Sequence, residues 1–113
     1  MGTIAVAFPV LPGKSEDGRR FAQEATERQR ETSESFRRMG ITRESWYLQS
    51  TPQGDLVIVY MEADDPLKAF QAWAASTDPY DQWFKQRAAS VCGIDFNQPL
   101  PALPEQVFHW AAG

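Results

Sequence analysis

The stretch ITRESWYLQSTPQGDLVIVYMEADD, residues 41–65, decides the fold that we expect for this chain. Two runs of alternating side chains, Ile41–Ser50 and Leu56–Ala63, flank Thr51–Asp55, whose proline and glycine are typical of a turn. This pattern predicts an antiparallel hairpin. The pairing register then decides which side chains share a face, because successive residues of a strand point to opposite sides.

Pairing that is symmetric about Gln53 gathers several functional groups on one face of the hairpin. The opposed pairs in this register are Leu48 with Ile58, Trp46 with Tyr60, and Glu44 with Glu62. Two neighbouring carboxyl groups raise one another's pKa, which favours an acid and a base near neutral pH. The alternative leaves Glu44 in solvent near the strand end and pairs Glu62 with Arg43 or Arg87. A shift of one residue on one strand also moves Glu44 to the face opposite Glu62.

The residues before the hairpin predict a strand and a long helix. Thr3–Val10 is apolar at both odd and even positions, which is typical of a strand covered on both faces. Apolar residues at spacings of three and four predict one helix over Ser15–Met39, ended by Gly40. Its apolar stripe is weak at Gln29 and Thr32. There the helix either overhangs the sheet into water or meets a polar partner surface.

The residues after the hairpin predict two short helices and a last strand. Asp65-Pro66 and Asp78-Pro79 each place an acidic N-cap before a proline at the first helical position. A proline-rich connector, residues 99–104, then leads to a predicted strand over Gln106–Trp110.

The predicted order β-α-β-β-α-α-β is that of an α+β, ferredoxin-like domain formed by residues 1–113. We expect a four-stranded antiparallel sheet with helices on one face. The strands Ile4–Phe8 and Leu56–Met61 are apolar on both sides, and an uncovered apolar patch is unusual in a soluble monomer. A second copy of the chain is the simplest cover, since two-fold homodimers are the commonest oligomers. We therefore expect a homodimer.

Composition and charge argue against several classes of partner. A net charge of −4 disfavours nucleic acid, whose binding needs a basic surface. Cys92 is the single cysteine, so no internal disulfide is possible and a zinc site built on cysteines has too few ligands. The apolar run Ile4–Leu11 is short and follows no basic residue, so it predicts neither a signal peptide nor a membrane span. We expect a cytoplasmic protein.

Several turns and caps give the chain a resemblance to a known superfamily. They are Gly54-Asp55, Tyr60–Pro66, Asp78–Phe84 and Gly93–Asp95. With the element order and the double-sided strands, they resemble the dimeric α/β-barrel superfamily, and within it a small group of uncharacterised bacterial proteins. The resemblance implies two ferredoxin-like chains that face their sheets together. The superfamily includes cofactor-independent monooxygenases, haem-handling enzymes, small-molecule isomerases and proteins without known activity. No catalytic motif of those enzymes can be laid onto this sequence.

The hairpin also supplies the candidate site residues. The rings of Trp46 and Tyr60 could line a barrel cavity and stack on a planar ligand, which the Tyr60 hydroxyl would orient, or they pack at the dimer seam. Glu44 and Phe8 complete the predicted ligand-binding set. Glu62 and Tyr60, together with His109, form the predicted catalytic set.

His109 is the only histidine of the chain. It would serve as a general base, or as a haem or metal ligand, if it pointed into the barrel; otherwise it is a surface residue. No His-x-x-x-His pattern or carboxylate cluster accompanies it, so we predict no metal site and no cofactor. Cys92 lies near a helix end, and burial is its expected role.

Three functional hypotheses follow, and whether the protein is an enzyme stays open among them. The first is a homodimer that binds a small apolar or aromatic metabolite, between sheet and helices or in the barrel, or that has only a structural role. The second is a cofactor-independent enzyme of the monooxygenase or isomerase type. The third is a haem-handling protein. The first is favoured because no recognisable catalytic set is present.

Overall fold

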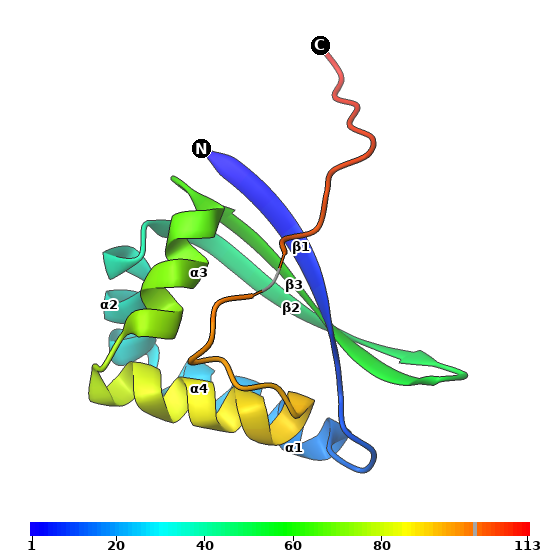
Figure 1. The fold of residues 1–113 in the computed structure, drawn as a ribbon, viewed down its shortest axis with the longest axis vertical. Coiled ribbons are helices and arrows are strands. Elements are labelled where there is room, and N and C mark those ends of the chain that lie inside the picture. The colour runs from blue at the N-terminus through cyan, green and yellow to red at the C-terminus, as the bar shows by residue number, and fades with distance from the viewer. Residues whose placement is uncertain (101) are drawn as a thin grey trace.

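The computed structural model describes residues 1–100 and 102–113 and places helices on one face of an antiparallel sheet (Figure 1). Pro101 of the predicted connector lies outside the described residues. The elements, in chain order, are β1 (Gly2–Pro9), α1 (Ser15–Glu27), α2 (Gln29–Arg38), β2 (Ile41–Thr51), β3 (Gly54–Ala63), α3 (Pro66–Ala75) and α4 (Pro79–Cys92).

The sheet has three strands in the order β1-β3-β2, and both pairs are antiparallel. The predicted four-stranded sheet is therefore wrong, and with it the ferredoxin-like class and the barrel of two such sheets. The predicted strand Gln106–Trp110 accounts for the difference, because these residues are exposed and lie outside every strand. Their alternating pattern suits a strand, but a strand also needs a neighbour for its backbone groups, and the described part of this chain provides none there.

The β2–β3 hairpin is confirmed, but its symmetric register about Gln53 is wrong. Thr51 pairs with Gly54, which leaves a loop of two residues. The Thr51 hydroxyl donates to the carbonyl oxygen of Gly54 at 2.5 Å and accepts from the N–H of Gln53 at 3.2 Å. Gly54 has a φ of 123°, which residues with a side chain rarely adopt. The tight loop thus shifts the pairing by one residue.

The shifted register separates the groups that symmetric pairing would gather. The observed pairs are Trp46 with Val59, Glu44 with Met61, and Arg43 with Glu62. Trp46 and Glu44 point toward the helices as a result. Tyr60 and Glu62 lie on the opposite side of the sheet.

The predicted helix Ser15–Met39 is two helices that meet at Arg28. Arg28 leaves the helical conformation with a ψ of 44°. The hydroxyl of Thr32 donates to the carbonyl oxygen of Ala25 at 2.8 Å, across the break, and also hydrogen-bonds to the Tyr80 hydroxyl of α4. At Thr32 the predicted stripe therefore meets a polar partner, as the second alternative expected, whereas Gln29 is exposed to solvent, as the first expected.

The predicted helix caps are confirmed. Asp65 accepts a hydrogen bond from the N–H of Lys68 at 3.2 Å, at the start of α3. Asp78 accepts from the N–H of Tyr80 at 2.9 Å, at the start of α4. Gly40 follows α2 with a φ of 76°, which suits a C′ glycine. These caps act over three or four residues, so the sequence alone specifies them.

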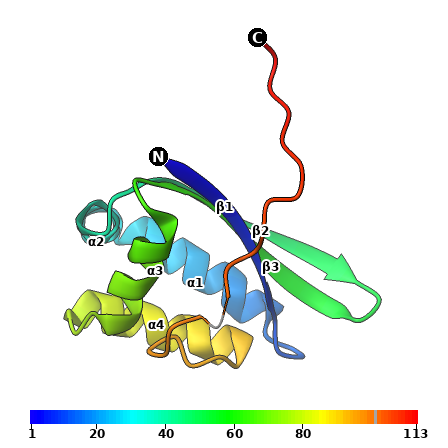
Figure 2. The ribbon, with the colours of Figure 1, turned by 45° about the horizontal axis from the view of Figure 1, so that its top comes forward.

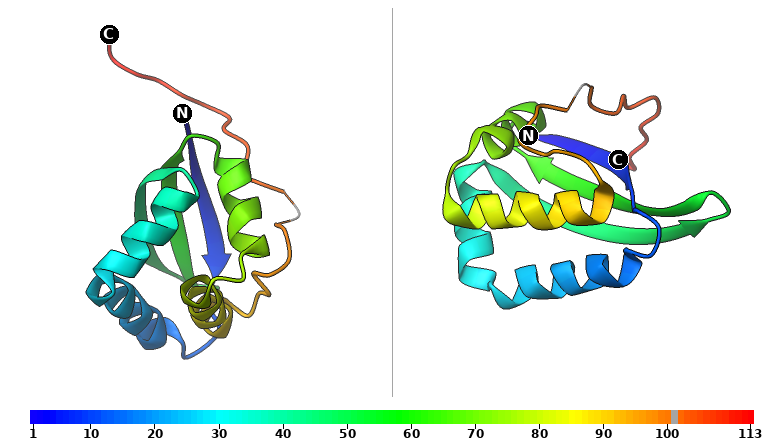
Figure 3. Two further views of the ribbon diagram at one scale, coloured as in Figure 1. Left: turned by 90° about the vertical axis from the view of Figure 1, so that its left-hand side faces the viewer. Right: turned by 60° about the horizontal axis from the view of Figure 1, so that its bottom comes forward.

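Helices cover one face of the sheet at two distances (Figures 2 and 3). α2 packs against β2, and α3 packs against β1 and β3. α1 and α4 pack against each other, farther from the sheet. None of the helices in the described residues has the length and the apolar run that crossing a bilayer requires.

We call the side of the sheet without helices the open face. It consists of Thr3, Ala5, Ala7 and Pro9 of β1, Arg43, Ser45, Tyr47 and Gln49 of β2, and Leu56, Ile58, Tyr60 and Glu62 of β3. We call residues 104–113 the C-terminal arm. All residues of the arm are exposed, and the arm runs away from the body of the protein (Figure 1).

Candidate functional site

A cavity of about 260 Å³ lies between the sheet and the helices, where α1 and α4 stand away from the strands. Every strand and every helix contributes to its lining. Val57, Val59 and Trp73 face it, and this explains why these apolar side chains are only half-buried. Ligand pockets of proteins measure about 300–1,000 Å³, and an apolar cavity of about 150 Å³ holds benzene. The volume therefore suits a molecule of about two rings.

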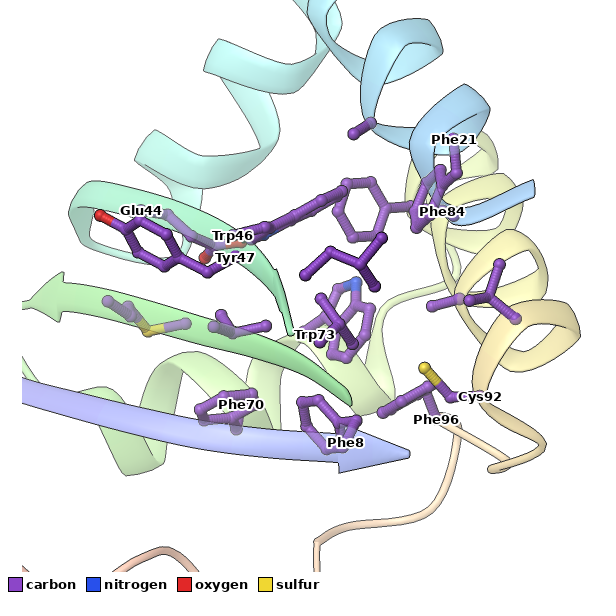
Figure 4. Close-up of a pocket in the computed structure, with 18 of the residues that line it drawn as sticks. Phe8, Phe21, Glu44, Trp46, Tyr47, Phe70, Trp73, Phe84, Cys92 and Phe96 are labelled. Carbon is purple, nitrogen blue, oxygen red and sulfur yellow. Dashed lines mark hydrogen bonds between the residues drawn. The ribbon is translucent and has the colours of Figure 1, made fainter. Parts of the chain in front are cut away.

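Aromatic rings form much of the cavity wall (Figure 4). Phe84 of α4 lies at the centre of a group of edge contacts, with ring centroids 4.9 Å from Phe21 and 5.7 Å from Trp73. On the β1 side, Phe8 and Phe96 meet edge to face at 5.3 Å. Rings arranged in this way present apolar surface to a bound molecule from several directions.

Glu44 brings a carboxyl group into this apolar cavity. It lies on β2 next to Trp46, whose indole N–H donates to Oε2 of Glu44 at 2.7 Å. Phe21 and Phe84 hold the Trp46 ring in place, at centroid distances of 5.2 Å and 5.6 Å. The other oxygen of Glu44, Oε1, accepts no hydrogen bond within the described residues. Since every fully buried side-chain oxygen in this part of the chain has a partner, Oε1 keeps some accessible surface, and Glu44 is among the residues that line the cavity.

Burial raises the pKa of Glu44 from its ordinary value of 4.5 to about 7, and the hydrogen bond from Trp46 opposes only part of this shift. The protein interior disfavours the ionised carboxylate because it solvates a charge less well than water does. Glu44 therefore changes its protonation state near neutral pH. It can donate a hydrogen bond below that range and can only accept one above it.

Cys92 also lines the cavity, and its predicted burial is confirmed. Burial raises the pKa of its thiol to about 11. The thiol therefore stays protonated at neutral pH and is a poor nucleophile, because the thiolate is the reactive form. Its contribution to the cavity is apolar surface.

Three of the four residues in the predicted ligand-binding set line the cavity. Trp46, Glu44 and Phe8 all line it, although the hairpin register that suggested the set is wrong. Tyr60 belongs to the open face and is not part of the lining.

The predicted catalytic residues do not gather at the cavity: Tyr60 and Glu62 lie together on the open face, and His109 belongs to the C-terminal arm. The Tyr60 hydroxyl donates to Oε2 of Glu62 at 2.5 Å on the open face, and this hydrogen bond raises the pKa of Tyr60. Arg43 lies 3.8 Å from Oε1 of Glu62, which bears out the pairing that was the alternative for Glu62. His109 is exposed on the C-terminal arm. In the described part of the chain, no three His, Cys, Asp or Glu side chains are grouped as metal ligands would be.

A second cluster of polar side chains lies between α2, α4 and the loop before α4. Asp81 is almost completely buried and accepts hydrogen bonds from Ser35 at 2.5 Å and from Ser76 at 2.6 Å. Arg38 approaches the same carboxylate at 3.4 Å. Lys85, also buried, donates to the carbonyl oxygens of Ala74 at 3.0 Å and of Ser76 at 2.9 Å. These buried groups have their partners within the protein, so the cluster fastens the helices and leaves no free group for a ligand.

The sequence interpretation missed two features of these sites. Asp81 and Lys85 are four residues apart on a helix, a spacing that is typical of an exposed ion pair, and nothing local marks them as buried. Glu44 was expected in solvent or opposite Glu62. The turn at Thr51 was the available signal for its inward direction, because a two-residue loop sets the register that turns Glu44 inward.

Comparison with known proteins identifies the family of the chain but no function. Residues 1–108 match a family described as a family of unknown function (DUF6176). No curated protein and no solved structure matches the chain. The match includes all seven helices and strands and every residue that lines the cavity. The chain therefore belongs to this family of unknown function.

Proposed function

We propose that the protein binds a small apolar or aromatic molecule in the cavity between the sheet and the helices. The observation that carries this proposal is a cavity of about 260 Å³ with aromatic walls and one buried carboxyl group, that of Glu44. Small-molecule sites commonly combine an apolar lining with a few well-placed polar groups. Binding in this place does not require the predicted four-stranded sheet.

The Glu44 carboxyl group would select the polar atom of the ligand. Trp46 already occupies Oε2, which leaves Oε1 for the bound molecule. Above pH 7 the ionised carboxylate accepts a hydrogen bond, and a hydroxyl or amine group on the ligand suits it. We therefore expect a ligand of one or two rings that carries a single hydrogen-bond donor.

Binding of 2-naphthol is expected to weaken about tenfold or more in the variant Ala88→Leu. Ala88 lies on α4 and lines the cavity, so a longer side chain there takes space that the ligand needs. Calorimetric titration at pH 8 measures the affinity, and a tenfold change corresponds to about 1.4 kcal/mol. The unaltered protein should bind one 2-naphthol molecule per chain.

The matched control is Ala72→Leu, which makes the same substitution at an exposed position of α3. Its affinity should equal that of the unaltered protein. Naphthalene, which lacks the hydroxyl group, should bind more weakly than 2-naphthol because it cannot donate to Glu44. Equal losses in both leucine variants, or no loss in Ala88→Leu, would place the ligand elsewhere.

We also propose that the protein is a homodimer in which the open face meets a second copy. Large apolar side chains support this: Tyr47, which also borders the cavity, is 59% exposed and stands in register with Ile58, which pairs on its other side with Ala7. Leu56 extends the apolar surface along β3. Contiguous apolar surface of this kind marks interaction sites.

We keep the cytoplasm as the proposed location, since a reducing compartment suits a single free cysteine.

The variant Ile58→Asp is expected to be monomeric at concentrations at which the unaltered protein is dimeric. Ile58 lies at the middle of the open face, so a two-fold dimer would bring two uncompensated carboxylates into its interface. Sedimentation velocity measures the change. Gln71→Asp, at an exposed position of α3, is the control and should leave the dimer intact. A dimer of undiminished affinity in Ile58→Asp would exclude the open face as the interface.

Proton transfer is a second candidate function, and the pKa of about 7 for Glu44 in an apolar cavity favours it. A carboxyl group with this pKa can both remove and return a proton at neutral pH. An isomerase that moves a proton between two carbons of a small substrate needs such a group and no redox partner. This candidate requires that Glu44 binds and releases its proton near pH 7, which the pH dependence of unfolding reports.

A further inference from the structure

The C-terminal arm exposes three large apolar side chains. Val107 is 86% exposed, Phe108 80% and Trp110 74%. Single exposed apolar residues are common on protein surfaces, but three within four residues are an unusual concentration, and we call the pair Phe108 and Trp110 the apolar ridge. The arm contributes nothing to either core cluster in the described residues, whereas Leu100 and Leu103 just before it pack against the larger one. Leu100 and Leu103 are therefore held by the core, whereas the residues of the arm are not.

The arm extends toward the space in front of the open face. In Figures 1 and 2 the helices lie on one side of the sheet, and the C-terminal end of the chain lies on the other side. The chain passes the edge of the sheet at β1 and continues away from its own body. Ten extended residues reach about 30 Å. An object docked on the open face would lie within this reach.

The open face has a suitable surface for the ridge along β1. Its β1 positions carry small side chains, with Ala5 and Ala7 both exposed, whereas its β3 positions carry the larger Ile58 and Tyr60. A row of small side chains beside larger ones leaves room for rings from another chain. The arm carries two such rings, on Phe108 and Trp110. In an extended segment residues two apart point to the same side, so both rings can contact one surface.

We propose that the arm of each chain crosses to a second copy and packs Phe108 and Trp110 against Ala5 and Ala7 of that copy. This inference rests on the proposed homodimer through the open face. A second copy is the occupant that fits, because one chain carries both the apolar arm and the apolar face. In a two-fold dimer each copy then gives one arm and receives one. The exchange covers surfaces that a single chain leaves in water.

A spin label on the arm tests which chain it touches. His109 is exposed, and in an extended arm its side chain would point away from Phe108 and Trp110, so a nitroxide on His109→Cys should not disturb the contact. Cys92 is buried with a raised thiol pKa and should not react with the nitroxide reagent. Treatment of the unaltered protein with the same reagent checks this. The chain with the nitroxide carries no nitrogen-15. It is mixed with a chain that carries nitrogen-15 and no nitroxide. Broadening of the amide signals of Ala5 and Ala7 in this mixture is then intermolecular.

We expect these two signals to lose more than half of their intensity in the mixture. In a second sample, one chain carries both the nitroxide and nitrogen-15 and is diluted with protein that carries neither, so that broadening is intramolecular. Broadening only in this sample would show that the arm folds back on its own sheet, and it would overturn the proposal. Absence of broadening would overturn it as well. Sedimentation of the same samples separates the two ideas: a dimer without intermolecular broadening removes the arm exchange alone, whereas a monomer removes the dimer too.

Substitutions in the arm give an independent measure. Replacing Phe108 and Trp110 together by serine should weaken dimerisation at least tenfold, while His109→Ser should leave it unchanged. Both variants should bind 2-naphthol like the unaltered protein, because no arm residue lines the cavity. Equal dimer affinity in the two variants would contradict the exchange.

Discussion

Between pH 4.5 and pH 7 the protein is expected to lose about 3 kcal/mol of unfolding free energy that the variant Glu44→Gln keeps. Burial in the cavity raises the pKa of Glu44 from 4.5 to about 7, and this difference corresponds to about 3 kcal/mol. Between these two pH values the folded state binds more protons than the unfolded state. Stability from this group is therefore fully present below pH 4.5 and is lost as the pH rises to about 7.

Urea unfolding at pH 4.5, 6 and 8 measures this effect as the difference between the two proteins. Other carboxyl groups titrate equally in both, so the difference isolates Glu44. Glutamine keeps the size of the side chain and an oxygen for the Trp46 N–H, but it carries no proton that titrates. Parallel pH profiles would show that the carboxyl group is solvated, and both the selection of a ligand by Glu44 and its role in proton transfer would then lose their basis.

The second large effect is expected for Asp81→Ala, which should lower the unfolding free energy by about 3–5 kcal/mol. The substitution leaves the buried hydroxyl of Ser35 without its acceptor, and it removes a negative charge that stabilises the buried ammonium group of Lys85. Breaking a buried charged network by removing one partner commonly costs this much. Chemical denaturation followed by circular dichroism measures the loss.

Glu16→Ala is the control for this prediction. Glu16 is an acidic residue on α1 whose side chain is 79% exposed and pairs with exposed Arg19. Its removal should change the unfolding free energy by less than about 0.5 kcal/mol. If Asp81→Ala were as mild as this control, the polar cluster would not fasten α2 to α4.

The two predictions concern different kinds of buried acid. Glu44 has one hydrogen-bond donor and lies in a cavity, so its carboxyl group favours the protonated form and stays available to a ligand. Asp81 accepts hydrogen bonds from two hydroxyl groups and lies near Arg38, so its charge is compensated within the protein. Both acids are buried, yet only the first has the surroundings of a functional group.

The sequence by itself determined the features that act over a few residues. The hairpin and the two acid-proline caps follow from alternation, from the fixed φ of proline and from side-chain acceptors close to the N–H groups that they serve. The burial of Cys92 was also predicted from the sequence and is confirmed, whereas the apolar pattern of β1 on both faces left the side of Phe8 open.

Only the tertiary structure decided where the functional groups meet. One residue of register places Glu44 and Trp46 in the cavity and Tyr60 outside it, and rings from α1 and α4 hold Trp46 there. The burial of Asp81 depends on Ser35, 46 residues away in the chain. The segment Gln106–Trp110 has the pattern of a strand, but residues 1–100 and 102–113 offer it no strand to pair with. Such outcomes depend on contacts between distant residues, which local periodicity does not record.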